Sequence, residues 1–203
     1  MLRVGLTGGF ACGKSFVGRT LEALGCFLLR ADDIGHEVLK PGGAAYDAVV
    51  HEFGAEILDD DATINRRRLA AIAFTDPEKL ARLNNLVHPA VIALEEQRIA
   101  EAARSKPDGI AVLEAAILIE TGSHKRFQKL IVVVCTEEQQ IARAMHRDGL
   151  TEEEARARLR RQMPLTEKRR FADYIIDTSG PKENTVEQTR AVYESLRSLQ
   201  RCA

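Results

Sequence analysis

The chain has 203 residues, of which 45% are hydrophobic and 29% charged, and its formal net charge is −1. This length suits one sizeable domain, and the composition is typical of a globular protein. The net charge gives no support to nucleic-acid binding, and no apolar run approaches the ~20 residues that span a bilayer. With no signal peptide ahead of the first apolar run, we expect a cytoplasmic protein without nucleic-acid or membrane partners.

Four scattered cysteines lack the spacing of metal sites and of C-x-x-C motifs: Cys12, Cys26, Cys135 and Cys202. Cys26 and Cys135 are expected to be small buried hydrophobes in strands. Cys12 precedes a predicted helix, whose N-terminus could lower the pKa of its thiol. The sequence leaves open a redox-sensing role for Cys12, although a passive loop residue is the commoner outcome.

Residues Gly8 to Ser15 read G-x-x-x-x-G-K-S, the pattern of a phosphate-binding loop. An apolar run over residues 2–6 precedes them and a helical pattern over residues 14–24 follows, so the motif has its strand–loop–helix context. Glycines let successive N–H groups point toward phosphate oxygens, and the helix N-terminus favours the same anion. Lys14 would then reach the β- and γ-phosphates, and the Ser15 hydroxyl would hold Mg²⁺. The expected nucleotide contacts are Gly8, Gly9, Ala11, Cys12, Gly13, Lys14, Ser15 and Phe16.

Two aspartates, Asp32 and Asp33, follow the second predicted strand, the apolar run at residues 26–29. Ligand groups in open α/β sheets gather beyond the carboxyl ends of strands, so we expect one of these carboxylates beside the phosphate loop. There it could orient a substrate hydroxyl and accept its proton. The alternative is an N-cap for a helix expected over residues 34–40. The same residues match the D-x-x-G signature of GTPases only weakly, since no N-K-x-D or T-K-x-D follows.

Residues 42–106 carry no convincing strand pattern and predict a helical insertion. Arg66-Arg67-Arg68 opens one of its helices and is either an anion-binding corner or an exposed face. A longer helical pattern runs from Pro77 to about Arg104, with a kink or break expected at His88-Pro89.

Strand patterns return at residues 109–113, 129–135 and 174–177, and helical patterns separate them. Thr136 with Gln139, and Thr151 with Glu154, have the spacing of capping boxes at helix starts. Alternating strands and helices predict a parallel α/β sheet with right-handed crossovers.

Residues 143–170 contain nine Lys and Arg against five Asp and Glu, a net charge of +4 in a chain whose total is −1. A helix–turn–helix with arginines suits a lid that donates hydrogen bonds to phosphoryl oxygens and excludes water. Arg143 and Arg147, one turn apart on one helix face, are the best candidates. The alternative is a solvated pair of charged helices.

The order of these motifs resembles that of the dephospho-CoA kinase family over nearly the whole chain. The resemblance is carried by the phosphate loop, Ala31-Asp32, Leu86-Val87-His88-Pro89, Arg143…Arg147-Asp148-Gly149-Leu150, Arg158…Gln162 and Ala172-Asp173…Ile175-Ile176-Asp177. It implies a P-loop NTPase-type three-layer α/β sandwich with a five-stranded parallel sheet. In this reading the core is residues 1–40 and 107–203, an acceptor-binding helical insertion is residues 42–106, and a lid is about residues 143–170.

The resemblance also implies that the γ-phosphate of ATP passes, with Mg²⁺, to the ribose 3′-hydroxyl of dephospho-CoA, the last step of coenzyme A synthesis. Asp32 matches the aspartate taken as the general base in that family, and the implied catalytic set is Asp32, Lys14, Arg143 and Arg147. A monomer or small homo-oligomer is expected.

The chain departs from the family pattern at several places. Arg30 replaces a usual Asp, Cys12 a usual Ser, Phe16 a usual Thr, and Thr178 an Asn near the adenine site. Two alternatives stay open: another small-molecule or nucleotide kinase, and a non-catalytic nucleotide-binding switch. The long insertion and the arginine-rich helices argue against the switch.

Overall fold

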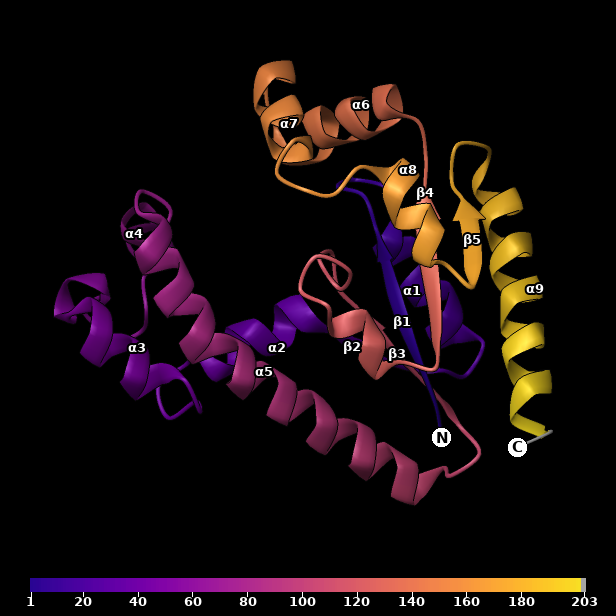
Figure 1. Ribbon diagram of the computed structural model, residues 1–203, viewed down its shortest axis with the longest axis horizontal. Coiled ribbons are helices and arrows are strands. Elements are labelled where there is room, and N and C mark those ends of the chain that lie inside the picture. Colours follow the sequence, from indigo (N-terminus) through magenta and orange to yellow (C-terminus); the bar gives the residue numbers. More distant parts are fainter. Residues whose placement is uncertain (202–203) are drawn as a thin grey trace. The chain divides into compact units, whose positions relative to one another are not determined.

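The computed structural model describes residues 1–201 and contains a five-stranded sheet flanked by helices (Figure 1). The strands are β1 (Leu2–Gly8), β2 (Phe27–Arg30), β3 (Ile110–Glu114), β4 (Lys129–Val134) and β5 (Tyr174–Asp177). Their spatial order is β2-β3-β1-β4-β5, and β1 pairs in parallel with both β3 and β4, while β4 pairs in parallel with β5. The predicted five-stranded parallel α/β sheet is confirmed.

The central strands are buried because they are nearly continuous apolar runs, as expected for parallel strands covered on both faces. All five residues of β3 are buried, and so are five of the seven in β1. Helices α1 (Lys14–Ala23) and α9 (Lys182–Arg201) lie side by side and add Val17, Leu21 and Leu196 to this core. Each fully buried aliphatic side chain contributes roughly 1.5–3 kcal/mol, so this core holds the end of β1 firmly in place.

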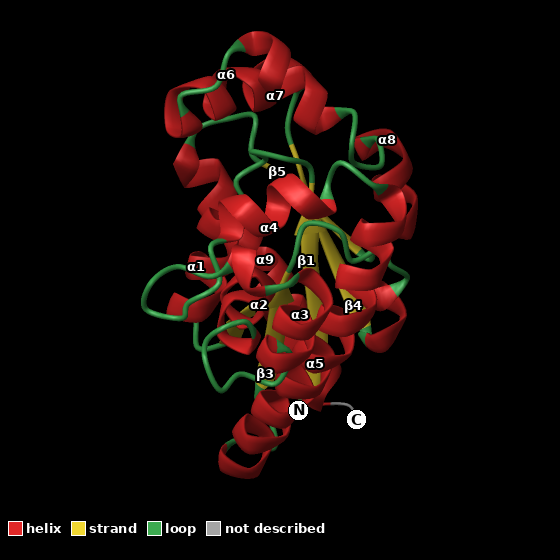
Figure 2. Ribbon diagram, turned by 90° about the vertical axis from the view of Figure 1, so that its left-hand side faces the viewer, coloured by secondary structure: helices red, strands yellow, loops and turns green. Residues whose placement is uncertain are grey.

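The remaining α-helices are α2 (Ala31–Val38), α3 (Tyr46–Phe53), α4 (Arg66–Ala73), α5 (Pro77–Ser105), α6 (Glu137–Asp148), α7 (Glu152–Leu159) and α8 (Leu165–Lys168). Both predicted capping boxes are present, Thr136 with Gln139 at α6 and Thr151 with Glu154 at α7. They fix where these two helices begin, and α6 and α7 lie side by side in both views (Figure 2).

Two predicted boundaries need correction. The helix after β2 begins at Ala31 rather than Ile34, so Asp32 and Asp33 lie in its first turn and neither is the N-cap. A break at His88-Pro89 is wrong, because α5, which is 29 residues long, continues through Pro89; a kink there stays a prediction. Proline removes one backbone hydrogen bond and crowds the preceding turn, and the helix on either side is long enough to absorb that cost.

The chain forms two compact units. The first comprises Met1–Leu29 and Ala102–Ala203, and the second comprises Arg30–Glu101. In the second unit Leu58 and Ile64 form an isolated antiparallel bridge between helical segments. Across residues 1–201, no helix is both long and apolar enough to cross a membrane.

Candidate active site

The phosphate loop connects β1 to α1 as the sequence predicts. Gly13 is the N-cap of α1 with φ 83°, and Ala11 also has a positive φ of 54°. Left-handed residues in such a loop turn backbone N–H groups toward one side, which makes an anion-binding nest. Among the described residues, the N–H groups of Ala11 and Gly13 donate to no backbone carbonyl in the turns, loops and caps. The loop therefore has the backbone of a phosphate site.

Lys14 and Ser15 occupy the first turn of α1. The Lys14 ammonium donates hydrogen bonds to the carbonyl oxygens of Gly9 at 2.8 Å and Gly8 at 3.4 Å, so it lies along the loop. The Ser15 hydroxyl donates a 2.6 Å hydrogen bond to Oε1 of Glu114. Glu114 is the last residue of β3, pairs with Leu6 of β1 in the sheet and is only 8% exposed.

Glu114 is a candidate site residue that no sequence motif reveals. A Cβ at Gly18, one turn into α1, would lie 3.0 Å from the Glu114 carboxylate, so the glycine leaves room for this side chain. The signal was present as an acidic residue at the carboxyl end of a buried strand. This signal places Glu114 beside Ser15 only if β3 lies next to β1, and the sequence alone does not give that strand order.

Arg143 is held beside the phosphate loop through Thr178. Its Nη1 and Nη2 donate to the hydroxyl and the carbonyl oxygen of Thr178, at 3.0 and 2.6 Å. The Thr178 hydroxyl in turn donates to the carbonyl oxygen of Cys12 at 2.8 Å. Thr178, a departure from the family pattern, therefore links an arginine of α6 to the loop.

Arg147 has a different partner. Its Nε and Nη2 donate to the carboxylate of Asp148 at 2.7 and 2.8 Å, and these bonds hold the pKa of Asp148 below its usual range. The guanidinium groups of Arg147 and of Arg158 in α7 also lie 5.9 and 5.7 Å from the ring centroid of Phe10 in the loop. Cation–π attraction of this kind lets both helices contact the loop through one aromatic side chain.

Two further buried polar residues support the loop. Gln140 of α6 donates to the carbonyl oxygen of Phe10 at 2.6 Å. Lys168 of α8 is fully buried, and its ammonium lies 2.8 Å from the carbonyl oxygen of Ala116, 2.8 Å from Oε1 of Glu120 and 3.5 Å from the carbonyl oxygen of Gly8. Three acceptors match the three donors of an ammonium group, so Lys168 is a structural cross-link rather than a solvated lid charge.

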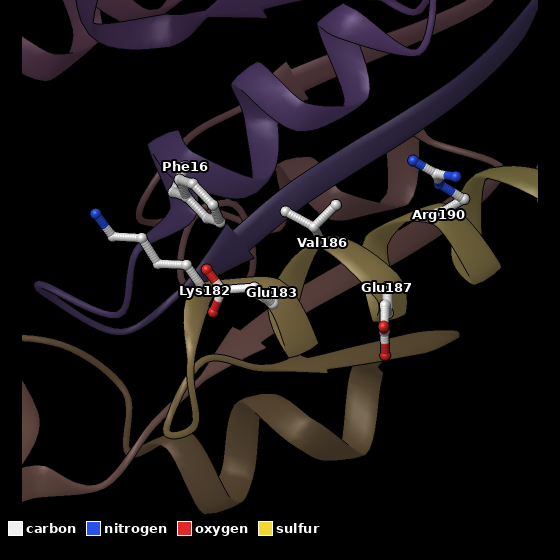
Figure 3. A pocket seen from close by; sticks show the side chains of 6 residues that line it. All are labelled: Phe16, Lys182, Glu183, Val186, Glu187 and Arg190. Atoms are coloured by element: carbon white, nitrogen blue, oxygen red, sulfur yellow. The ribbon is translucent and has the colours of Figure 1, made fainter.

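Phe16 faces away from this network. Its ring lines a pocket of about 500 Å³ together with side chains of α9 (Figure 3). The α9 residues are Lys182, Glu183, Val186, Glu187 and Arg190. The Phe16 N–H donates to the carbonyl oxygen of Gly13 at 3.0 Å, within the helix start. A contact from Phe16 to the nucleotide stays a prediction.

Asp32 lies in the second unit, exposed in the first turn of α2 and two residues beyond the end of β2. Within that unit Arg98 donates to both oxygens of Glu37 at 2.6 and 2.7 Å, which anchors α2 to α5. A groove of about 460 Å³ borders the same helices. Its lining includes Lys40, Pro41, Gly43, Ala90, Leu94 and Gln97.

The cysteines differ from expectation. Cys26 and Cys135 lie just outside the ends of β2 and β4 rather than within them, and burial raises the pKa of Cys26 to about 12. The pKa of Cys12 is raised rather than lowered, because its thiol hydrogen-bonds with Cys135 and is buried. Cys202 lies outside the described residues.

Comparison with known proteins agrees with the geometry of the loop and the sheet. The sequence matches the profile of the dephospho-CoA kinase family over residues 2–184. The dephospho-CoA kinase of Aquifex aeolicus is 41% identical over 97% of this chain and 98% of its own length. That of Geobacter metallireducens is 42% identical over 96% of both chains.

Several solved structures are similar to this one over nearly the whole chain. TT1252 from Thermus thermophilus has a TM-score of 0.81 and 30% identity over 96% of this chain and 97% of its own. The dephospho-CoA kinase from Campylobacter jejuni has a TM-score of 0.71 and 28% identity over 97% of both. A shikimate kinase from Bacteroides thetaiotaomicron, at 13% identity and a TM-score of 0.53, shares the fold over 96% of this chain and 98% of its own. The chain therefore belongs to the dephospho-CoA kinase family.

Proposed function

We propose that this protein, an ATP-dependent kinase by its family, transfers the γ-phosphate of ATP to the ribose 3′-hydroxyl of dephospho-CoA and releases ADP and coenzyme A. The observation that carries the proposal is the connected phosphate site of the first unit. There a P-loop lysine, a serine–carboxylate pair and an arginine tied to the loop by Thr178 are joined to one backbone nest. Positioning and charge stabilisation by such groups are most of what phosphoryl transfer requires of a protein.

The donor nucleotide is assigned to the loop. The N–H groups of Ala11 and Gly13, together with the positive end of α1, favour phosphate oxygens. The Lys14 ammonium, now bonded to Gly9 and Gly8, can exchange these neutral carbonyls for the more negative β- and γ-phosphates.

Ser15 and Glu114 fit a magnesium ion. Their oxygens are hard donors, and they lie 2.6 Å apart at the end of β3. We assign Mg²⁺ to Ser15, with Glu114 holding the serine hydroxyl or water ligands in place. When bound, the ion neutralises charge that develops on the phosphate oxygens.

Asp32 is assigned as the general base. It follows the carboxyl end of β2 by two residues, the part of an open α/β sheet where ligand groups gather. In this role its carboxylate accepts the proton of the 3′-hydroxyl as the oxygen attacks the γ-phosphorus, and the bond to the β-phosphate oxygen breaks. The helical segment over residues 42–106 is proposed to bind dephospho-CoA.

Arg143 and Arg147 are assigned to the lid, proposed over about residues 143–170. Arginine donors are well suited to the equatorial oxygens of a transferring phosphoryl group. Arg143 is already fixed at the loop by Thr178, whereas Arg147 would have to leave Asp148.

A coupled assay of ADP release, with and without dephospho-CoA, tests the proposal. We expect release that depends on the acceptor, and we expect Lys14→Ala to abolish it while the far-ultraviolet circular dichroism is retained. Turnover of a nucleoside monophosphate but not of dephospho-CoA would instead identify a nucleotide kinase. ATP binding without any acceptor-dependent ADP release would identify a nucleotide-binding switch.

A further inference from the structure

Two thiols meet at the phosphate loop. Cys12 lies in the loop after β1, and Cys135 follows the last residue of the adjacent strand β4. Their sulfur atoms are 3.3 Å apart although 123 residues separate them in the sequence. Parallel pairing of β1 with β4 places the residues beyond both carboxyl ends at the same edge of the sheet, which explains the approach.

We propose that Cys12 and Cys135 are a site of reversible disulfide formation by peroxides, and that the disulfide inactivates the phosphate loop. This modification lies beyond the kinase reaction, in which neither thiol has a chemical role. Neither of the two strands has to move as a whole for it to occur.

The short distance between the two sulfur atoms allows a disulfide bond to form with little movement. A disulfide needs a sulfur–sulfur separation of about 2.05 Å, so the sulfurs must approach by only ~1.2 Å. Cys12 is completely buried, whereas Cys135 is partly exposed. An oxidant therefore reaches Cys135 first, and Cys12 serves as the resolving thiol.

The surroundings of Cys135 favour its thiolate. In the neutral pair the Cys135 thiol donates to the Cys12 sulfur; once Cys135 is ionised, Cys12 donates instead. That hydrogen bond and the nearby guanidinium of Arg143 lower the pKa of Cys135, while the same pairing and burial raise the pKa of Cys12. An accessible thiolate beside a second thiol is the arrangement of peroxide-sensitive cysteine pairs.

The chemistry balances with hydrogen peroxide as the oxidant. The Cys135 thiolate attacks one peroxide oxygen, the O–O bond breaks, and the departing hydroxide takes a proton to become water. Cys12 then attacks the sulfur of the Cys135 sulfenic acid, the S–O bond breaks, and the Cys12 proton leaves with the hydroxyl as a second water. Two thiols and one peroxide thus give one disulfide and two waters, and a dithiol reductant reverses the change.

Inactivation is expected because the backbone of Cys12 makes two of the hydrogen bonds that hold the loop. Its N–H donates to the carbonyl oxygen of Gly9 at 3.3 Å, and its own carbonyl oxygen accepts from Thr178 at 2.8 Å. Drawing Cys12 toward Cys135 displaces the neighbouring N–H groups of the nest. A displacement of about 1 Å at a reacting centre lowers the reaction rate on the order of 10²-fold. We therefore expect the rate of phosphoryl transfer to fall by about that factor in the oxidised enzyme.

The test treats the full chain with hydrogen peroxide and then measures binding of a fluorescent ATP analogue, so that the outcome does not depend on the acceptor. We expect weakened binding that dithiothreitol restores, and a cross-linked peptide pair that contains Cys12 and Cys135. Cys135→Ser, which removes the thiol that oxidant reaches first, should bind the analogue normally and resist peroxide. Cys26→Ser is the matched control and should remain as sensitive as the unmodified chain.

Three outcomes would overturn the proposal. One is equal peroxide sensitivity of the Cys135→Ser variant and the unmodified chain. Another is a cross-link that joins either cysteine to Cys26 or Cys202, or to a second copy of the chain. The third is a Cys12–Cys135 disulfide that leaves binding of the ATP analogue unchanged.

Discussion

The hydroxyl of Ser15 donates a 2.6 Å hydrogen bond to Oε1 of Glu114, and so joins the first turn of α1 to the last residue of β3. The pair brings together a neutral oxygen donor and a carboxylate at the end of the central strands. This relationship makes Glu114 the residue through which the proposed Mg²⁺ site can be tested.

Replacing Glu114 with glutamine should weaken the use of Mg²⁺ without disturbing the fold, because the amide has the same shape and no charge. Residues that orient metal ligands typically contribute 10- to 100-fold in metal affinity. We therefore expect the Mg²⁺ concentration for half-maximal ADP release to rise by roughly 10- to 100-fold. Glu187→Gln, an exposed glutamate of α9, is the control. An unchanged Mg²⁺ dependence in Glu114→Gln would remove Glu114 from the site.

Lys168→Met should destabilise the first unit. The change leaves the Glu120 carboxylate and the Ala116 carbonyl oxygen without their buried cation. Removing one partner of a buried ion pair costs roughly 3–5 kcal/mol, and we expect the lower end because the Glu120 side chain is 22% exposed. Urea unfolding measures the loss.

The double variant Lys168→Met with Glu120→Gln is the companion experiment for that ion pair. It removes the uncompensated charge and should recover part of the lost stability. A single Lys168→Met variant as stable as the unmodified chain would show that the lysine is not a structural cross-link.

Local patterns in the sequence were enough to predict the phosphate loop and both capping boxes, because each depends on residues a few positions apart. The strand patterns also predicted the sheet, since long β-branched runs are typical of buried parallel strands. The break predicted at Pro89 follows from a local rule about proline, but the long helix around Pro89 continues without interruption.

The candidate site residues that sequence motifs do not reveal owe their importance to neighbours far along the chain. Glu114 meets Ser15 across 99 positions, and Thr178 meets Cys12 across 166. Lys168 is one of the nine cations of residues 143–170, the proposed lid, yet it is completely buried. Hydrophobic periodicity predicts which side chains are buried, but the strand order decides which of them meet.

Asp32→Asn should lower the rate constant of phosphoryl transfer by roughly 10²–10⁴-fold, the usual contribution of a positioned general base. Asp33→Asn is a closely matched control, since both aspartates are exposed in the first turn of α2. Single-turnover kinetics with saturating ATP and dephospho-CoA isolate the chemical step. Equal losses in the two variants, or full activity in Asp32→Asn, would refute the assignment of the base.

Stability should fall in acid partly through Asp148. Hydrogen bonds from Arg147 lower the pKa of this carboxyl in the folded state, so its contribution is present above the unfolded pKa of about 3.9 and is lost as the pH falls through the folded value. Arg147 is 62% exposed, so screening limits the contribution to under about 1 kcal/mol. Urea unfolding at neutral and acid pH should show a shallower loss for Asp148→Asn. The difference should shrink at about 1 M salt, where charges are screened within ~3 Å.

Arg143 and Arg147 should differ in their effect on catalysis, although the sequence gives them the same rank. Arg143 is fixed to Thr178, which bonds the loop at Cys12, so Arg143→Ala should disturb both the proposed phosphate contact and the loop. Removing one preorganised donor to a developing charge costs on the order of 10²–10³-fold in kcat. Arg147 must first give up two hydrogen bonds to Asp148, so we expect a smaller loss of kcat in Arg147→Ala. Asp148→Asn, which frees Arg147, should not reduce kcat. If Arg147→Ala proved the more damaging variant, Arg147 rather than Arg143 would be the principal phosphate ligand of the proposed lid.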